Sequence, residues 1–146
     1  MKINFKLFFI LVGLTVIFSS CRTSAPRLDY QALARASVLL GIDINLEDDH
    51  KLYLEAADWI GAPYRGGGDS KRGTDCSGMV YQIYRKVYRI QVPRNTEELK
   101  NKSNKVAKRN LKEGDLVFFS SNRSRKRVAH VGIYLKSCLL YTSDAA

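Results

Sequence analysis

The stretch GTDCSGMVYQIY, residues 73–84, places a cysteine between an acid and a serine at the point where an apolar pattern begins. The apolar side chains that recur at helical spacing are Met79, Val80, Ile83, Tyr84 and Val87. This pattern predicts a helix over residues 76–88, with Thr74 or Asp75 as its N-terminal cap. A thiol at a helix N-terminus lies near unpaired N–H groups and the positive end of the helix dipole, which favour the thiolate. Cys76 is therefore a candidate nucleophile, with a packing residue, a disulfide partner and a metal ligand as the alternatives.

A reactive cysteine works best beside an imidazole base, and the chain has two histidines. His50 lies among acids near the start of a predicted amphipathic helix, residues 46–60, where a surface position is the simplest interpretation. His130 lies in VAHVGIYL, residues 128–135, whose alternating pattern predicts a strand. A lone histidine more often serves in a core or on a surface, but this context favours His130 as the base.

The order of the predicted elements indicates the fold class. Helices are expected over residues 28–40, 46–60, 76–88 and around 97–99, and strands over 115–119 and 128–135. Gly41 is a suitable cap after the first helix, and residues 61–73 form a loop rich in glycine. Helices followed by strands, without regular alternation, predict an α+β fold.

Composition limits the classes of function. A chain of 146 residues with 45% hydrophobic and 26% charged residues is typical of one globular domain. The net charge of +10 suits an anionic polymer or membrane surface, but the basic residues are scattered and no nucleic-acid motif is present. We therefore expect no nucleic-acid partner. The cysteines and histidines do not form a group of four ligands, so we expect no structural zinc site.

The N-terminus has the layout of a secretory signal, which we assign to residues 1–20. Two lysines precede an apolar run over residues 7–18, and two serines come directly before Cys21. This junction resembles a bacterial lipobox, so Cys21 is the expected lipidation site and residues 21–27 the expected tether. An ordinary cleaved signal with an incidental cysteine is the alternative. Either interpretation predicts export, and the first predicts a membrane-anchored protein of the cell envelope.

Several blocks in one order carry a family resemblance: GAPYRGGG, GTDCSG, VPRNT, LKEGDLVFF and AHVGIYL. Together they resemble the NlpC-type family of papain-like cysteine peptidases, which cut bacterial peptidoglycan. The resemblance implies a papain-like fold, in which helices, one bearing the nucleophile, pack on a small antiparallel, barrel-like sheet. It implies cleavage of stem peptides by thiol acyl transfer, typically between γ-D-glutamate and a diamino acid, with neither a metal nor an organic cofactor.

The resemblance also assigns roles to single residues. Cys76 is the implied nucleophile and His130 its base, while Tyr64 lines the pocket beside them. Asp75 and Ser77 match positions that hold the free amine of the stem peptide, although both could equally well cap the helix. Arg94 matches a frequent arginine, for which we expect a structural role.

The chain departs from the family pattern near its end. The family supplies a third polar group, usually histidine, about a dozen residues after the base, but KSCLLYTSDAA contains no histidine, asparagine or glutamine. Thr142 is near the expected place. We interpret residues 136–146 as a non-native tail without strand character, and residues 28–135 as an incomplete peptidase domain. A catalytically inactive wall-binding relative and a thiol-dependent amidase or acyltransferase are the competing hypotheses.

Overall fold

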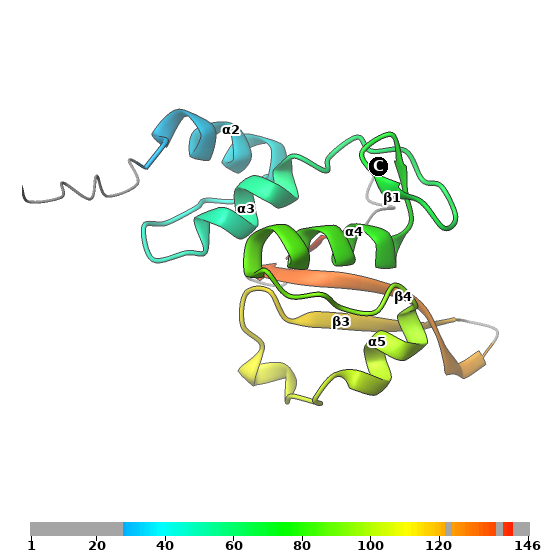
Figure 1. The fold of residues 1–146 in the computed structure, drawn as a ribbon. Coiled ribbons are helices and arrows are strands. Elements are labelled where there is room, and N and C mark those ends of the chain that lie inside the picture. The colour runs from blue at the N-terminus through cyan, green and yellow to red at the C-terminus, as the bar shows by residue number, and fades with distance from the viewer. Residues whose placement is uncertain (1–27, 122–123, 137–138, 142–146) are drawn as a thin grey trace, which may run out of the picture.

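The computed structural model describes residues 28–121, 124–136 and 139–141 (Figure 1). The expected signal peptide, Cys21 and the tether lie outside the described residues, as do Cys138 and Thr142. None of the helices in the described part is long and apolar enough to cross a bilayer.

The first helix, α2 (Tyr30–Leu40), has the two caps that its sequence encodes. The Asp29 side chain accepts the N–H of Ala32 at 3.0 Å, which satisfies one of the free donors of the first turn. Gly41 follows with a φ of 68°, a left-handed conformation that glycine adopts without strain. The predicted cap at Gly41 is confirmed.

The second helix, α3 (His50–Ala57), is shorter than the predicted helix over residues 46–60. It starts later because the Asp49 side chain accepts the N–H of Leu52 at 3.2 Å and ends the preceding loop. Asp48 stays in that loop and pairs with Lys136 of the sheet at 2.7 Å. The acids that precede His50 therefore lie before the helix, with Asp49 as its cap.

The helix that begins at Cys76 changes geometry along its length. It is α-helical in α4 (Cys76–Ile83) and π-helical in η1 (Tyr84–Tyr88), so the predicted extent is confirmed and the π turn is new. The Tyr84 hydroxyl donates to the carbonyl oxygen of Gly114, and the Tyr88 hydroxyl donates to Asp49 Oδ2 at 3.0 Å. These bonds tie the helix to the loop before the sheet and to the start of α3.

The main sheet is antiparallel and open. Its strands have the order β3 (Leu116–Ser121), β4 (Ser124–Lys136) and β5 (Leu139–Tyr141). Phe119 lies opposite His130. The α+β class is confirmed, but the sheet does not close into a barrel. The expectation that residues 136–146 lack a strand is corrected, because β5 pairs with β4 and places Tyr141 opposite Ile133.

The loop rich in glycine also contains order that its sequence did not predict. Within it, β1 (Asp69–Ser70) and β2 (Gly73–Thr74) form a short antiparallel hairpin that leads directly into α4. The backbone of the loop contacts the backbone of the first turn of α4 at Gly78. A Cβ at this position would overlap the carbonyl oxygen of Gly68. A further helix, α5 (Thr96–Lys102), confirms the short helix predicted around residues 97–99.

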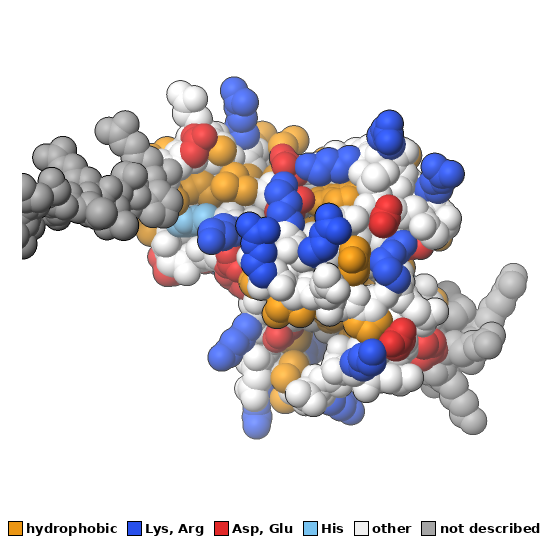
Figure 2. Space-filling model, viewed as in Figure 1, with side chains coloured by type: hydrophobic (Ala, Val, Ile, Leu, Met, Phe, Trp, Pro, Cys, Tyr) orange, Lys and Arg blue, Asp and Glu red, His pale blue; other side chains and the backbone are white. Residues whose placement is uncertain are grey.

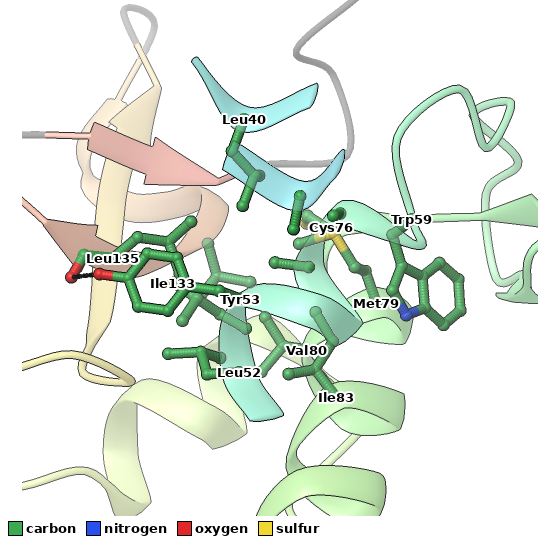
Figure 3. Packing of buried hydrophobic residues seen from close by; sticks show 14 of the residues in the cluster. Leu40, Leu52, Tyr53, Trp59, Cys76, Met79, Val80, Ile83, Ile133 and Leu135 are labelled. Atoms are coloured by element: carbon green, nitrogen blue, oxygen red, sulfur yellow. Dashed lines mark hydrogen bonds between the residues drawn. The ribbon is translucent and has the colours of Figure 1, made fainter. Parts of the chain in front are cut away.

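The core lies between the helices and one face of the sheet (Figure 3). Its fully buried side chains come from α3, α4 and β4, namely Leu52, Tyr53, Ala56, Met79, Val80, Ile83, Val131, Ile133 and Leu135. Figure 3 shows Cys76 near Met79, on the side of the cluster where Trp59 lies. Burial of apolar area drives this packing, and it holds α4 against β4 (Figure 1). The start of α4 is thereby placed beside the middle of β4.

Candidate active site

Cys76 is the first residue of α4 and is 8% exposed. It is the only cysteine among the described residues, and its thiol is free. Asp75 caps the helix in front of it, with Oδ1 accepting the N–H of Gly78 at 2.7 Å. Because α4 starts directly after this cap, Cys76 lies at the helix N-terminus, as the sequence predicts.

The packing of α4 on β4 brings His130, rather than His50, to this thiol. The pKa of Cys76 lies below its usual value: burial alone would raise it, but hydrogen bonds with the His130 ring and the Val131 backbone outweigh burial. The charge of the imidazole lowers this pKa further. The imidazole lies against the Phe119 ring, with centroids 6.0 Å apart. His50 is elsewhere, with Nε2 2.7 Å from the carbonyl oxygen of Asn45.

Thr96 is a member of the site that the sequence analysis missed. Its Oγ1 lies 3.9 Å from the Cys76 sulfur and also helps to lower the thiol pKa. Asn95 holds it there by capping α5, accepting the N–H groups of Glu97 at 2.9 Å and Glu98 at 3.2 Å. An asparagine directly before a helical pattern can predict this cap. It could not show that α5 starts beside the Cys76 thiol.

Asp75 and Ser77 lie in one bonded group with Arg94. Ser77 Oγ donates to Asp75 Oδ1 at 3.1 Å, and Arg94 Nη1 donates to the same oxygen at 3.2 Å. Arg94 Nη2 reaches the carbonyl oxygen of Gly68 at 3.0 Å, which confirms its structural role. Burial raises the pKa of Asp75, but hydrogen bonds from the Gly78 and Gly67 N–H groups and from Arg94 lower it overall. The carboxylate is therefore held in its charged form, and Asp75 acts as the cap that the sequence allowed.

Tyr64 lies beside the segment that leads into α4. Its backbone pairs with Thr74, which is two residues before the nucleophile candidate. The Arg65 N–H donates to Thr74 O at 2.8 Å, and the Thr74 N–H donates to Pro63 O at 3.0 Å. The Tyr64 side chain is 65% exposed and is available to a ligand. The described residues contain no group of three or more potential metal ligands.

The lowered pKa of Cys76 predicts a measurable reactivity. Because the thiolate is the species that reacts, iodoacetamide should modify Cys76 at a lower pH than it modifies an ordinary cysteine. In the variant His130→Gln, the midpoint of the alkylation curve should move to higher pH, since a neutral amide supplies no positive charge. Peptide mapping by mass spectrometry separates Cys76 from the other cysteines. His50→Gln is the matched control, and an equal shift in both variants would contradict the pairing.

Comparisons with known proteins place this geometry in a family. The model of the NlpC/P60 family matches residues 61–143. The probable endopeptidase NlpC homolog of Haemophilus influenzae is 31% identical over 152 residues, which cover 89% of this chain and 80% of that protein. The murein DD-endopeptidase MepS/murein LD-carboxypeptidase of Escherichia coli is 37% identical, over 62% of this chain and 47% of its own.

Two further comparisons agree. The gamma-DL-glutamyl hydrolase of Bacillus subtilis is 41% identical, over 59% of this chain and 21% of its own. The crystal structure of an NLP/P60 family protein, similar to lipoprotein, from Staphylococcus aureus superposes with a TM-score of 0.59 at 30% identity, over 68% of this chain and 34% of that one. This chain thus spans most of the first relative and half or less of the others. It belongs to the NlpC/P60 family and is a cell-wall peptidase, a hydrolase of peptidoglycan.

Proposed function

We propose that Cys76 and His130 cleave peptidoglycan stem peptides by acyl transfer. The observation that supports this most directly is the thiol at the start of α4, whose pKa is lowered by the imidazole of β4. A thiolate is the nucleophile that such a reaction needs, and an imidazolium beside it can donate a proton to the leaving amine.

The reaction has two stages. In the first, the Cys76 sulfur forms a bond to the carbonyl carbon, and the negative charge that develops on the oxygen is stabilised by N–H groups at the start of α4. The C–N bond then breaks while His130 gives its proton to the leaving amine. In the second stage, His130 takes a proton from water, whose oxygen attacks the thioester. The acid product leaves, and Cys76 is again a thiolate beside a protonated His130.

We propose the bond between γ-D-glutamate and the diamino acid as the one that is cut. A free amine at the start of the stem peptide would bind near Asp75 and Ser77, and Tyr64 would line the rim. Among the described residues, Asp75 Oδ2 accepts one hydrogen bond, from the Gly67 N–H at 2.7 Å, so this oxygen has a lone pair left for an ammonium. The name of the B. subtilis relative supports a glutamyl bond. The E. coli relative is named a murein DD-endopeptidase, which makes a bond between two D-configured centres of cross-linked murein the second candidate.

A pair of synthetic peptides tests this proposal. The peptide L-Ala–γ-D-Glu–diamino acid–D-Ala is prepared with a free and with an acetylated N-terminus, and the products are identified by mass spectrometry. We expect cleavage after γ-D-Glu and a preference for the free amine. Asp75→Asn should raise KM for the free peptide by about tenfold, the value of one charge-assisted hydrogen bond, and leave the acetylated peptide unchanged. Asparagine also caps helices, so the fold should survive.

The matched control is Asp69→Asn, which removes an exposed acid from the adjacent hairpin. An equal rise in KM for both peptides in Asp75→Asn would show that this residue acts only as a cap. Cleavage confined to a cross-linked dimer would move the assignment to the second candidate bond.

We further propose that the protein is a lipoprotein of the cell envelope, anchored through Cys21. The apolar run over residues 7–18 and the two serines before Cys21 support a lipidated N-terminus. The S. aureus structural neighbour is described as similar to a lipoprotein, which agrees with this assignment. Mass spectrometry of the N-terminal peptide from the membrane fraction would detect acyl chains on Cys21.

A further inference from the structure

Helix α2 carries apolar side chains on the face that points away from the core. Its inner face is formed by Leu33, Ala36 and Leu40, all of which are buried. On the outside, Tyr30 is 68% exposed and Val38 82% exposed, and they lie eight residues apart, about 80° around the helix axis. A helix that is apolar on both faces normally has a partner on each.

Exposed apolar residues are concentrated in this part of the chain. Of the eight large hydrophobic side chains that are exposed among the described residues, four lie between residues 30 and 46, namely Tyr30, Val38, Leu39 and Leu46. Figure 2 shows the hydrophobic side chains gathered over α2 and α3, with lysine and arginine side chains nearby. Scattered exposed residues need no explanation, whereas a cluster of this kind indicates an interaction surface.

A groove of about 510 Å³ lies between α2, α3 and η1, and it borders the outer face of α2 at Arg35 and Leu39. Its apolar wall consists of Ala32, Ala36, Leu39, Leu54, Ala57 and Val87. Arg35, Lys51 and Lys86 add three cations to the lining. Both acids of the lining already have basic partners, since Glu55 pairs with Lys86 and Asp58 pairs with Lys71. The groove therefore offers apolar surface together with the cations Arg35 and Lys51, a combination that suits an anionic amphiphile.

The sequence before α2 indicates which amphiphile lies within reach. Seven residues, 21–27, separate the expected lipidation site from the described chain, and they can span at most about 25 Å. They contain two more arginines, Arg22 and Arg27. An anchor at Cys21 would thus keep α2 close to the lipid surface. Basic residues would then lie near that surface both in the connecting segment and in the helices that follow it.

We propose that the outer face of α2, defined by Tyr30, Arg35, Val38 and Leu39 together with Lys51, docks on an anionic lipid surface. The apolar side chains enter the acyl boundary, and Arg35 and Lys51 contact phosphate headgroups. The proposal rests on the proposed anchoring and adds an orientation to it. In Figure 1, α2 and the β1–β2 hairpin that leads into Cys76 lie at opposite ends of the upper layer. Docking through α2 would therefore leave the site open toward the cell wall.

Tryptophan fluorescence tests the docking. Val38→Trp places a reporter on the proposed face, and Val106→Trp places one at an exposed valine in a distant loop, while the native Trp59 is buried in both variants. The full chain is purified in detergent and reconstituted into vesicles that contain phosphatidylglycerol with brominated acyl chains. We expect the added emission of Val38→Trp to fall by roughly half, because interfacial helices lie within the reach of the bromines. Emission from Val106→Trp should stay nearly unchanged.

The following outcomes decide the proposal without any measurement of peptidase activity. Replacement of phosphatidylglycerol by phosphatidylcholine should weaken the quenching of Val38→Trp, and Arg35→Glu should weaken it in the anionic vesicles. Equal quenching of the two reporters, or none in either, would overturn the docking. A dimer in sedimentation that Val38→Glu converts to a monomer would assign the face to a second copy instead. Quenching of Val38→Trp in the Cys76→Ala background would show that docking does not depend on peptide hydrolysis.

Discussion

Replacement of Cys76 by alanine is expected to lower the rate of muropeptide hydrolysis by at least about 10⁴-fold. Alanine has no group that can form the thioester, so only binding and the N–H groups of α4 would remain to accelerate attack by water. The measurement is the release of products from purified muropeptides, followed by liquid chromatography and mass spectrometry. Because the change removes a single heavy atom from the core cluster, the helices should stay intact, which circular dichroism checks.

One control variant and two possible outcomes give this result its meaning. Thr96→Val removes the hydroxyl that lies 3.9 Å from the sulfur but keeps the thiol, so hydrolysis should fall far less than in Cys76→Ala. Equal product from wild type and Cys76→Ala would reject the nucleophile. Absence of product from the folded wild-type chain, with retained binding of wall peptides, would instead support the inactive relative.

Replacement of Gly78 by alanine is expected to destabilise the protein by roughly 1–3 kcal/mol, which is the cost of overpacking. At a solvent-exposed position inside a helix, the change from glycine to alanine would stabilise the protein by about 1 kcal/mol. Here the new Cβ would overlap the carbonyl oxygen of Gly68 and lie 2.9 Å from Thr74 Oγ1. That carbonyl accepts hydrogen bonds from Arg94 at 3.0 Å and from the Asp75 N–H at 3.2 Å. The loop must move, and hydrolysis should fall by about tenfold or more because the site is displaced.

Gly66→Ala is the matched control, because a Cβ at Gly66 meets no atom within 4 Å. Urea denaturation gives the free energy of unfolding for both variants, and the muropeptide assay gives the rate. A stability of Gly78→Ala equal to or above that of the wild type would contradict the close approach of the loop to α4. A large loss in Gly66→Ala would contradict the open space at that position.

Local chemistry predicted much of the helical part. The spacing of apolar residues after Cys76 predicted the extent of the helix, and Gly41 and Asp75 are caps whose side chains or backbone act within a few residues. Such features depend on neighbours along the chain. The strand context of His130 favoured it as the base, and the family resemblance implied the same pairing with Cys76. No local pattern shows, however, that this helix and this strand, 54 positions apart, pack together.

What sequence reasoning missed depends on contacts between distant segments. The contact of Thr96 with the thiol requires α5 to start beside α4, and the pairing of Asp48 with Lys136 holds an acid in the loop before α3. The strand β5 was missed because three residues are too few for an alternating pattern, whereas β4 provides a paired edge for them.

Arg94 has a consequence for how a substrate would be recognised. One guanidinium faces the Asp75 carboxylate at 3.2 Å and two carbonyl oxygens of the glycine loop, so the resident charges at the mouth of the site already balance. An incoming ammonium group would be a second cation beside one anion. Arg94 donates to Asp75 Oδ1, whereas Oδ2 accepts the Gly67 N–H, so the ammonium would approach Oδ2. Selectivity for a charged amine would then depend on how well one carboxylate serves two cations at once, with a different oxygen for each.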